Sequence, residues 1–344
     1  MKNIFIISFI VSSMVFSSCE TDVLDKGPLD VVDESLVWTD PATAELYLND
    51  LYNYLTSYNI WDNLDNMSDL TDGGHSWLGC YTYNFGEVSS STDPFSKWSY
   101  YTQIRKVNNV LDHKDQLKGE EADINRVLGQ AIFLRAYFYF YLVRAYGGVP
   151  LIEKAQTLAD NLFLSRNSYE ECVAFIADEM DAAAELLPEQ WEDASTGRPT
   201  KGAALAVKAR LLLYAASPLN NPGNDMAKWQ KASDAAKAVI DLGVYDLYPD
   251  YAAMFRVDNN QEVIFDVQWA YPYRFTGDPA EICSAEFAIN PQGLNGAWGM
   301  NRPTQNFVDM FDMADGKSIS DPSSDYDPRW SATRYSAARP GLVG

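Results

Sequence analysis

Most of the middle of the chain carries apolar residues at the spacing of amphipathic helices. This pattern predicts helices over residues 42–55, 98–111, 120–146, 169–187, 203–216 and 229–242. Gly147 and Gly148 end the third of these helices, and Pro188 and Pro218 end the fourth and the fifth. Paired helices separated by short breakers tend to stack. We therefore predict a mainly α fold, a tetratricopeptide-like superhelix of helical pairs with a loop-rich, irregular ligand-binding region.

Two long stretches interrupt the helical pattern. Residues 58–97 are rich in Asn, Asp, Gly, Ser and aromatics, and residues 266–306 are rich in Pro, Gly, Asn, Tyr and Trp. Before the second stretch, the apolar segment 262–265 predicts a short strand. Loops of this length within a compact domain usually carry function, so both stretches are the first places to look for a binding site.

The N-terminus predicts export and lipidation. Lys2 precedes an apolar run over residues 4–16, and Ser17-Ser18 leads directly to Cys19. A positive start, a short apolar core and small residues before a cut site are typical of a secretion signal. A cysteine at this place is where a bacterial lipoprotein is cut and acylated. We expect residues 1–18 to be a signal peptide and Cys19 to hold the chain to a membrane of the cell envelope by lipid.

Charge and composition exclude several functions. The 48 acidic residues outnumber the 26 basic ones, which gives a formal net charge of −22, so nucleic acid is not an expected partner. The two histidines leave little material for a metal site or a Ser-His-Asp triad. No CxxC occurs, and Cys80, Cys172 and Cys283 are widely spaced, so we expect free thiols. We predict no metal, no cofactor and no enzyme activity.

The third predicted helix holds the most distinctive segment of the chain. It has the sequence QAIFLRAYFYF over residues 130–140 and continues as LVRAYGGVPL over residues 142–151. This segment resembles the signature of the SusD/RagB family of outer-membrane lipoproteins. Further matches follow in the family's order, among them Trp38, Trp98 with Tyr101, Ile104 and Asn108, then Leu187-Pro188, Gly197-Arg198-Pro199-Thr200, Pro303-Thr304-Gln305 and Asp327-Pro328-Arg329.

The resemblance implies a function and a domain organisation. Members of this family capture glycans or peptides for a partner TonB-dependent outer-membrane transporter. By this likeness, residues 19–260 form an N-terminal helical-repeat region with the inserted loop 58–97, and residues 261–344 begin a C-terminal loop-rich region. Family members run further beyond Arg329, so we expect this sequence to be shortened, by truncation or a frameshift, and its ligand face to be incomplete.

Aromatic residues of the two loops are the leading site candidates, because an aromatic face stacks on the apolar face of a sugar ring. They are Trp77, Tyr81 and Tyr83 in the first loop and Trp269, Tyr271, Tyr273 and Trp298 in the second. Polar candidates for the sugar hydroxyls are Asp72 and Arg302, followed by Asp69 and Asn301. Packing beneath a loop is an equally good explanation for each aromatic residue, and turn chemistry is the alternative for the polar ones.

Other conspicuous residues have structural explanations. The helical spacing of Trp38 and Trp98 predicts core positions. Arg135 and Arg144 are expected to tie helices together, and the segment 198–201 to cap a helix start. The function predicted first is capture of oligosaccharide or polysaccharide at the cell surface. Peptide capture by a member of the same family, an envelope hydrolase and a purely structural helical scaffold remain as alternatives.

Overall fold

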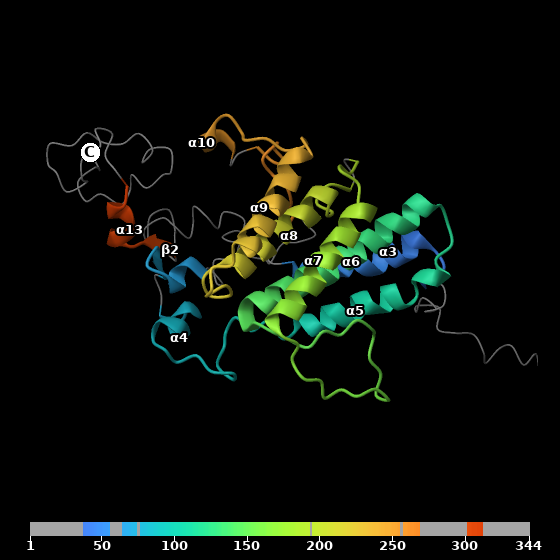
Figure 1. Cartoon of the computed structure of the whole chain (residues 1–344), viewed down its shortest axis with the longest axis horizontal. Helices are drawn as coiled ribbons and strands as arrows, with labels where there is room; N and C mark the ends of the chain where they lie inside the picture. The colour runs from blue at the N-terminus through green and yellow to red at the C-terminus, as the bar shows by residue number, and fades with distance from the viewer. Residues whose placement is uncertain are drawn as a thin grey trace, which may run out of the picture.

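The chain forms an array of α-helices with one small two-stranded sheet beside it (Figure 1). The computed structural model describes residues 37–55, 64–73, 76–192, 195–254, 257–268 and 301–311. The longer helices are α3 (Pro41–Asn49), α5 (Tyr100–Asp112), α6 (Glu121–Tyr146), α7 (Tyr169–Leu186), α8 (Lys201–Ala216) and α9 (Met226–Asp241). The shorter elements are η2 (Asp50–Tyr54), η3 (Leu64–Met67), β1 (Thr71–Gly73), α4 (Cys80–Asn84), η4 (Lys114–Gln116), α10 (Tyr251–Met254), β2 (Asn301–Pro303) and α13 (Gln305–Asp309).

Capping side chains fix where the helices begin. Asp40 accepts a hydrogen bond from the Ala42 amide at 3.0 Å, and Pro41 follows as the first residue of α3. Ser168 and Glu171 form a reciprocal capping box at the start of α7. The Thr200 hydroxyl accepts from the Ala203 amide at 3.1 Å and caps α8, so the predicted cap of segment 198–201 is confirmed.

Each long helix from α5 to α9 packs on the next one in the sequence (Figure 1). The predicted helical pairs and the mainly α fold are therefore confirmed. Helix α6 ends at Gly147, whose φ of 69° lies in the left-handed region that favours glycine. No helix of the described segments combines the length and the apolar character of a membrane span.

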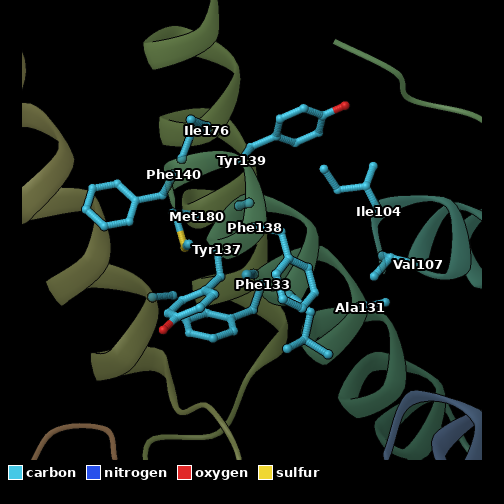
Figure 2. Close-up of a cluster of buried hydrophobic side chains, with 14 of the residues drawn as sticks. Ile104, Val107, Ala131, Phe133, Tyr137, Phe138, Tyr139, Phe140, Ile176 and Met180 are labelled. Carbon is cyan, nitrogen blue, oxygen red and sulfur yellow. The ribbon is translucent and has the colours of Figure 1, made fainter. Parts of the chain in front are cut away.

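Helix α6 forms the centre of the hydrophobic core (Figure 2). Every residue from Phe133 to Val143 is buried, so neighbouring segments cover this part of the helix on all sides, and Arg135 is its one charged residue. The Phe138 ring packs against Tyr100 of α5 with centroids 5.1 Å apart, and Phe140 stacks on Tyr214 of α8 at 5.9 Å. The aromatic run of the family-like segment is therefore core packing.

One buried ion pair joins α6 to α7. The Arg135 guanidinium donates from Nε and Nη2 to the two carboxylate oxygens of Glu179, at 2.7 and 2.8 Å. It also donates to Asn108 of α5 at 2.9 Å. Arg135 thus ties helices together as predicted, whereas the exposed Arg144 lies 4.6 Å over the ring of Tyr141 on its own helix.

Two sequence predictions are wrong. Residues 262–265 form no strand; this piece runs in irregular conformation, and Phe265 packs edge-on against Phe133 at 5.3 Å. Trp38 is buried as predicted, but Trp98 is 39% exposed. Trp98 lies before the first residue of α5, so the helical spacing does not aim its ring into the core. Instead the ring lies flat on Tyr146 at a centroid distance of 4.1 Å.

Candidate functional site: a small sheet and its exposed aromatic residues

The two loop-rich stretches meet in the β1–β2 sheet. The strands are antiparallel, with Asp72 opposite Arg302 and Gly73 opposite Asn301. The Thr304 amide extends the contact by donating to the Leu70 carbonyl at 3.0 Å, and its hydroxyl donates to the Asp69 carbonyl. The sheet lies beside one end of the helical array, close to α4 and α13 (Figure 1). We call β1, β2, α4 and the adjoining residues 76–79 and 85 the sheet corner.

Tyr81 links α4 to the sheet. Its hydroxyl donates to the Gly73 carbonyl and lies 3.3 Å from the Asp72 carboxylate. Burial raises the pKa of Tyr81, and the Asp72 charge adds to this, while the charge of Arg302 lowers it. The charged groups of both strands thus act on one hydroxyl, which stays a neutral hydrogen-bond donor at physiological pH.

Gly73 is required by this close packing. A Cβ at this position would lie 2.8 Å from Leu78 Cδ1 and 2.9 Å from Cys80 Sγ, closer than real contacts allow. A hydrogen bond within the first loop adds to this packing, since Asn84 Nδ2 donates to the Asn66 backbone carbonyl at 3.0 Å. The sheet corner is therefore well packed, and its exposed side chains project from an ordered backbone.

Two large aromatic side chains stand exposed on the sheet corner. Trp77, before α4, is 52% exposed, and Phe85, directly after α4, is 67% exposed. Tyr81 stacks on Phe85 with centroids 5.4 Å apart and an interplanar angle of 23°. Phe85 was not among the predicted site residues; the only signal in the sequence is its place in the same loop as Trp77. Tyr81 connects Phe85 to the sheet, since it stacks on Phe85 and its hydroxyl contacts Asp72.

Tyr83, which shares a loop with the exposed Trp77, makes contacts within that loop. Its hydroxyl donates to the Asp93 carboxylate at 2.6 Å, and its ring stacks on Phe95 at 5.7 Å. Burial, followed by the hydrogen bond to Asp93, raises the pKa of Tyr83 to about 12. These contacts attach the segment after α4 to Tyr83. Both the ring and the hydroxyl of Tyr83 thus already have partners within the protein.

The other predicted site residues stand as follows. Asp69, Asp72 and Arg302 are exposed and lie in or next to the sheet. Asn301 is the first residue of β2. Five predicted positions lie outside the described residues: Cys19, Trp269, Tyr271, Tyr273 and Trp298.

A second aromatic group surrounds the exposed Trp98. Tyr146 stacks on the Trp98 ring, and the Arg166 guanidinium lies 5.4 Å from the ring centroid. Arg166 also donates to the Tyr146 and Gly148 carbonyls at 3.2 and 3.3 Å. These contacts fasten the segment before α7 to the end of α6, and they give Trp98 a structural role.

Neither a metal centre nor reactive thiols stand out in the described part of the chain. No cluster of three His, Cys, Asp or Glu side chains there could hold a metal ion. Cys80 and Cys172 are buried free thiols, and burial raises the pKa of both. The predicted free state of these two cysteines is confirmed.

Comparison with known proteins agrees with the architecture. A SusD-like family model described as "Starch-binding associating with outer membrane" matches residues 29–213, more than half of the chain. The chain belongs to the SusD-like family. A SusD-like protein of Bacteroides ovatus is 26% identical over 318 residues, which cover 88% of this chain and 57% of that protein. A SusD-like protein P25 of Formosa agariphila is 23% identical over 79% of this chain and 53% of its own length.

Solved structures of SusD-like proteins have the same fold. The crystal structure of a SusD-like protein from Bacteroides fragilis superposes with a TM-score of 0.70 at 32% identity, covering 85% of this chain and 57% of that one. A laminarin-binding SusD-like protein superposes with a TM-score of 0.57 at 24% identity, over 66% of this chain and 51% of that one. The chain thus spans about half the length of the relatives it matches.

Proposed function

We propose that this SusD-like chain binds carbohydrate at the sheet corner and does not cleave it. The proposal rests on one observation. Trp77 and Phe85 are exposed on the same sheet corner as strands β1 and β2, in which Asp72 lies opposite Arg302. Ring C–H faces of a sugar are apolar and slightly positive, and they stack on the negative face of an aromatic ring. A carboxylate and a guanidinium add charge-assisted hydrogen bonds to the sugar hydroxyls.

The family and the net charge of the chain favour a neutral carbohydrate as the ligand. The matching family is described as starch-binding, and a protein of the same fold is described as laminarin-binding; both names denote neutral glucans. The formal net charge of −22 repels acidic polymers. A neutral oligosaccharide or polysaccharide is therefore the ligand we propose, in place of an acidic one.

We further propose how binding serves the cell. Cys19 would hold the chain to the outer membrane by lipid after removal of residues 1–18, facing the exterior. The bound glycan would then pass to a partner TonB-dependent transporter. In this proposal residues 19–260 form the helical-repeat region, and residues 261–344 begin the loop-rich region that adds Trp269, Tyr271, Tyr273 and Trp298 to the ligand surface.

Affinity electrophoresis tests the proposal. The chain from Glu20 onward is run through gels that contain starch, laminarin or the acidic polymer alginate. Retardation by a neutral glucan, loss of retardation in Trp77→Ala, and no released sugar after long incubation are the expected results. Failure of every neutral glucan to retard the protein, together with binding of peptides, would replace glycan capture by peptide capture. Release of sugar would instead make the chain a hydrolase.

A further inference from the structure

A groove of about 660 Å³ lies between α7, α8 and α9, away from the sheet corner. Its floor is apolar and is built largely from alanines. The residues that matter here are Ala174, Ala177, Leu212, Ala215, Ala235 and Ala238. The three helices lie side by side in Figure 1. We call this feature the α7–α9 groove.

Polar contacts between α7 and α9 brace one end of the groove. Lys228 Nζ, in the first turn of α9, lies 3.9 Å from the Glu170 carboxylate in the first turn of α7. The same Nζ donates to the Asn220 carbonyl at 2.9 Å, and Asn220 Nδ2 donates to the Tyr169 hydroxyl at 3.1 Å. These contacts link the N-terminal ends of α7 and α9, partly through Asn220 in the segment that precedes α9.

The two walls of the groove carry different charges. The α7 wall presents the acidic residues Glu170, Asp178 and Asp181. Lys208 of α8 also lines the groove and pairs with Asp181 at 2.5 Å, and Glu170 lies near Lys228, so Asp178 carries the remaining acidic charge of this wall. The α9 wall presents Lys228 and Lys231, with Asp234 one turn further on. Within the described segments, neither Asp178 nor Lys231 makes an ion pair. An occupant with a basic flank toward α7 and an acidic flank toward the start of α9 would be complementary to both walls.

The groove favours an α-helix over an extended strand. Three helices line it, and their backbone groups are already used within those helices, so the groove offers no sheet edge to pair with. An occupant must therefore satisfy its own backbone hydrogen bonds, which a helix does. The alanine floor lets its apolar face approach closely. Along α7 the lining runs from Tyr169 to Asp181, about 18 Å, or roughly three turns of helix.

We propose that the α7–α9 groove binds an amphipathic α-helix of a partner protein. The apolar stripe of this helix packs on the alanine floor, its Lys or Arg flank faces Asp178 of α7, and its Asp or Glu flank faces Lys231 of α9. This site is separate from the sheet corner and does not depend on glycan binding. It would let the chain hold a protein partner while a glycan occupies the other site.

Two designed peptides test the proposal. Each is a helical peptide with a Leu and Ala stripe, Lys on one flank and Glu on the other; the second peptide has the same composition with the two flanks exchanged. Binding of the fluorescein-labelled peptides to the chain from Glu20 onward is measured by fluorescence anisotropy. The peptide with the matching flanks should bind at least about fivefold more tightly than the exchanged one.

Variants of the chain complete the test. Ala177→Glu, which puts a charge on the floor, should weaken binding of the matching peptide at least about tenfold. Lys231→Glu, at an exposed position, should reverse the preference between the two peptides, and Lys237→Glu, on α9 outside the groove, should change neither. Equal binding of both peptides, no binding, or no effect of Ala177→Glu and Lys231→Glu would overturn the proposal. So would sedimentation of the chain as a dimer that Lys231→Glu dissociates, since the occupant would then be a second copy.

Discussion

Asp72 and Arg302 lie directly opposite each other in the antiparallel sheet, although they come from opposite ends of the described sequence. The Tyr81 hydroxyl contacts Asp72 and its ring stacks on Phe85. The exposed Trp77 directly precedes Leu78, which packs at Gly73 of β1. The helical array carries the sheet corner but contributes none of these side chains. The proposed binding residues and the scaffold are therefore separate, and mutations can address each one alone.

Burial, and after it the charge of Asp72, raises the pKa of Tyr81. Since burial and Asp72 raise the pKa of this phenol, Asp72→Asn should lower it toward the ordinary value of about 10. A group with a raised folded-state pKa stabilises the fold below its unfolded pKa, and this contribution is lost as the pH rises through the folded value. Ultraviolet difference titration, with Tyr81→Phe to identify the phenol, measures the shift. An unchanged or higher pKa in Asp72→Asn would contradict this electrostatic coupling.

Gly148 has no room for a side chain. A Cβ there would collide with the Asn167 carbonyl oxygen and lie 3.1 Å from the Tyr169 amide nitrogen, both of which are backbone atoms. Gly148→Ala should therefore lower the free energy of unfolding by about 1–3 kcal/mol in urea denaturation. Gly223→Ala is the matched control, because nothing lies within 4 Å of a Cβ at that position. Equal stability of the two variants would show that the backbone at Gly148 yields without cost.

Removing Arg135 leaves the largely buried carboxylate of Glu179 without its ion pair. Arg135→Met should lower the free energy of unfolding by about 3–5 kcal/mol. Lys106→Met breaks the exposed pair with Asp50 and should cost no more than about 1 kcal/mol. Urea denaturation of both variants checks this contrast. The double variant Arg135→Met with Glu179→Leu should recover part of the loss, and a loss as large as that of Arg135→Met alone would contradict the account.

The capping box of α7 makes stability depend on pH. Hydrogen bonds from the Ser168 amide and hydroxyl lower the pKa of Glu171, so its charged form stabilises the fold. This contribution is present above the unfolded pKa of about 4.3 and is lost as the pH falls through the folded value. Ser168→Ala should cost about 1 kcal/mol at neutral pH, and Glu171→Gln should be destabilising at pH 7 but neutral near pH 3. A pH-independent effect of Glu171→Gln in thermal melts would rule out this explanation.

Sequence reasoning located the helices because their signals are local. The capping residues Asp40 and Thr200 and the breakers Gly147 and Pro188 each act within one turn, and the observed boundaries fall within three residues of those predicted at these ends. The aromatic run of α6 is core packing, because an almost continuous apolar run needs cover on every side of the helix.

The site was less predictable because it depends on contacts that are distant in sequence. Nothing near Asp72 indicates that Arg302 lies opposite, since strands of three residues carry too little pattern to predict their pairing. Residue type alone could not separate Trp77, which is exposed, from Tyr83, whose hydroxyl and ring are engaged by Asp93 and Phe95. Trp98 was misplaced for a related reason: it lies just outside the helix whose spacing was used.

Calorimetric titration with the neutral glucan oligosaccharide that binds best tests the central claim most directly. The comparison is between Trp77→Ala and Trp98→Ala, which make the same change at two exposed tryptophans, only one of them on the sheet corner. We predict that Trp77→Ala weakens binding about five- to fiftyfold, whereas Trp98→Ala leaves the affinity unchanged while both variants stay folded. Full affinity in Trp77→Ala, or an equal loss in the two variants, would contradict carbohydrate binding at the sheet corner.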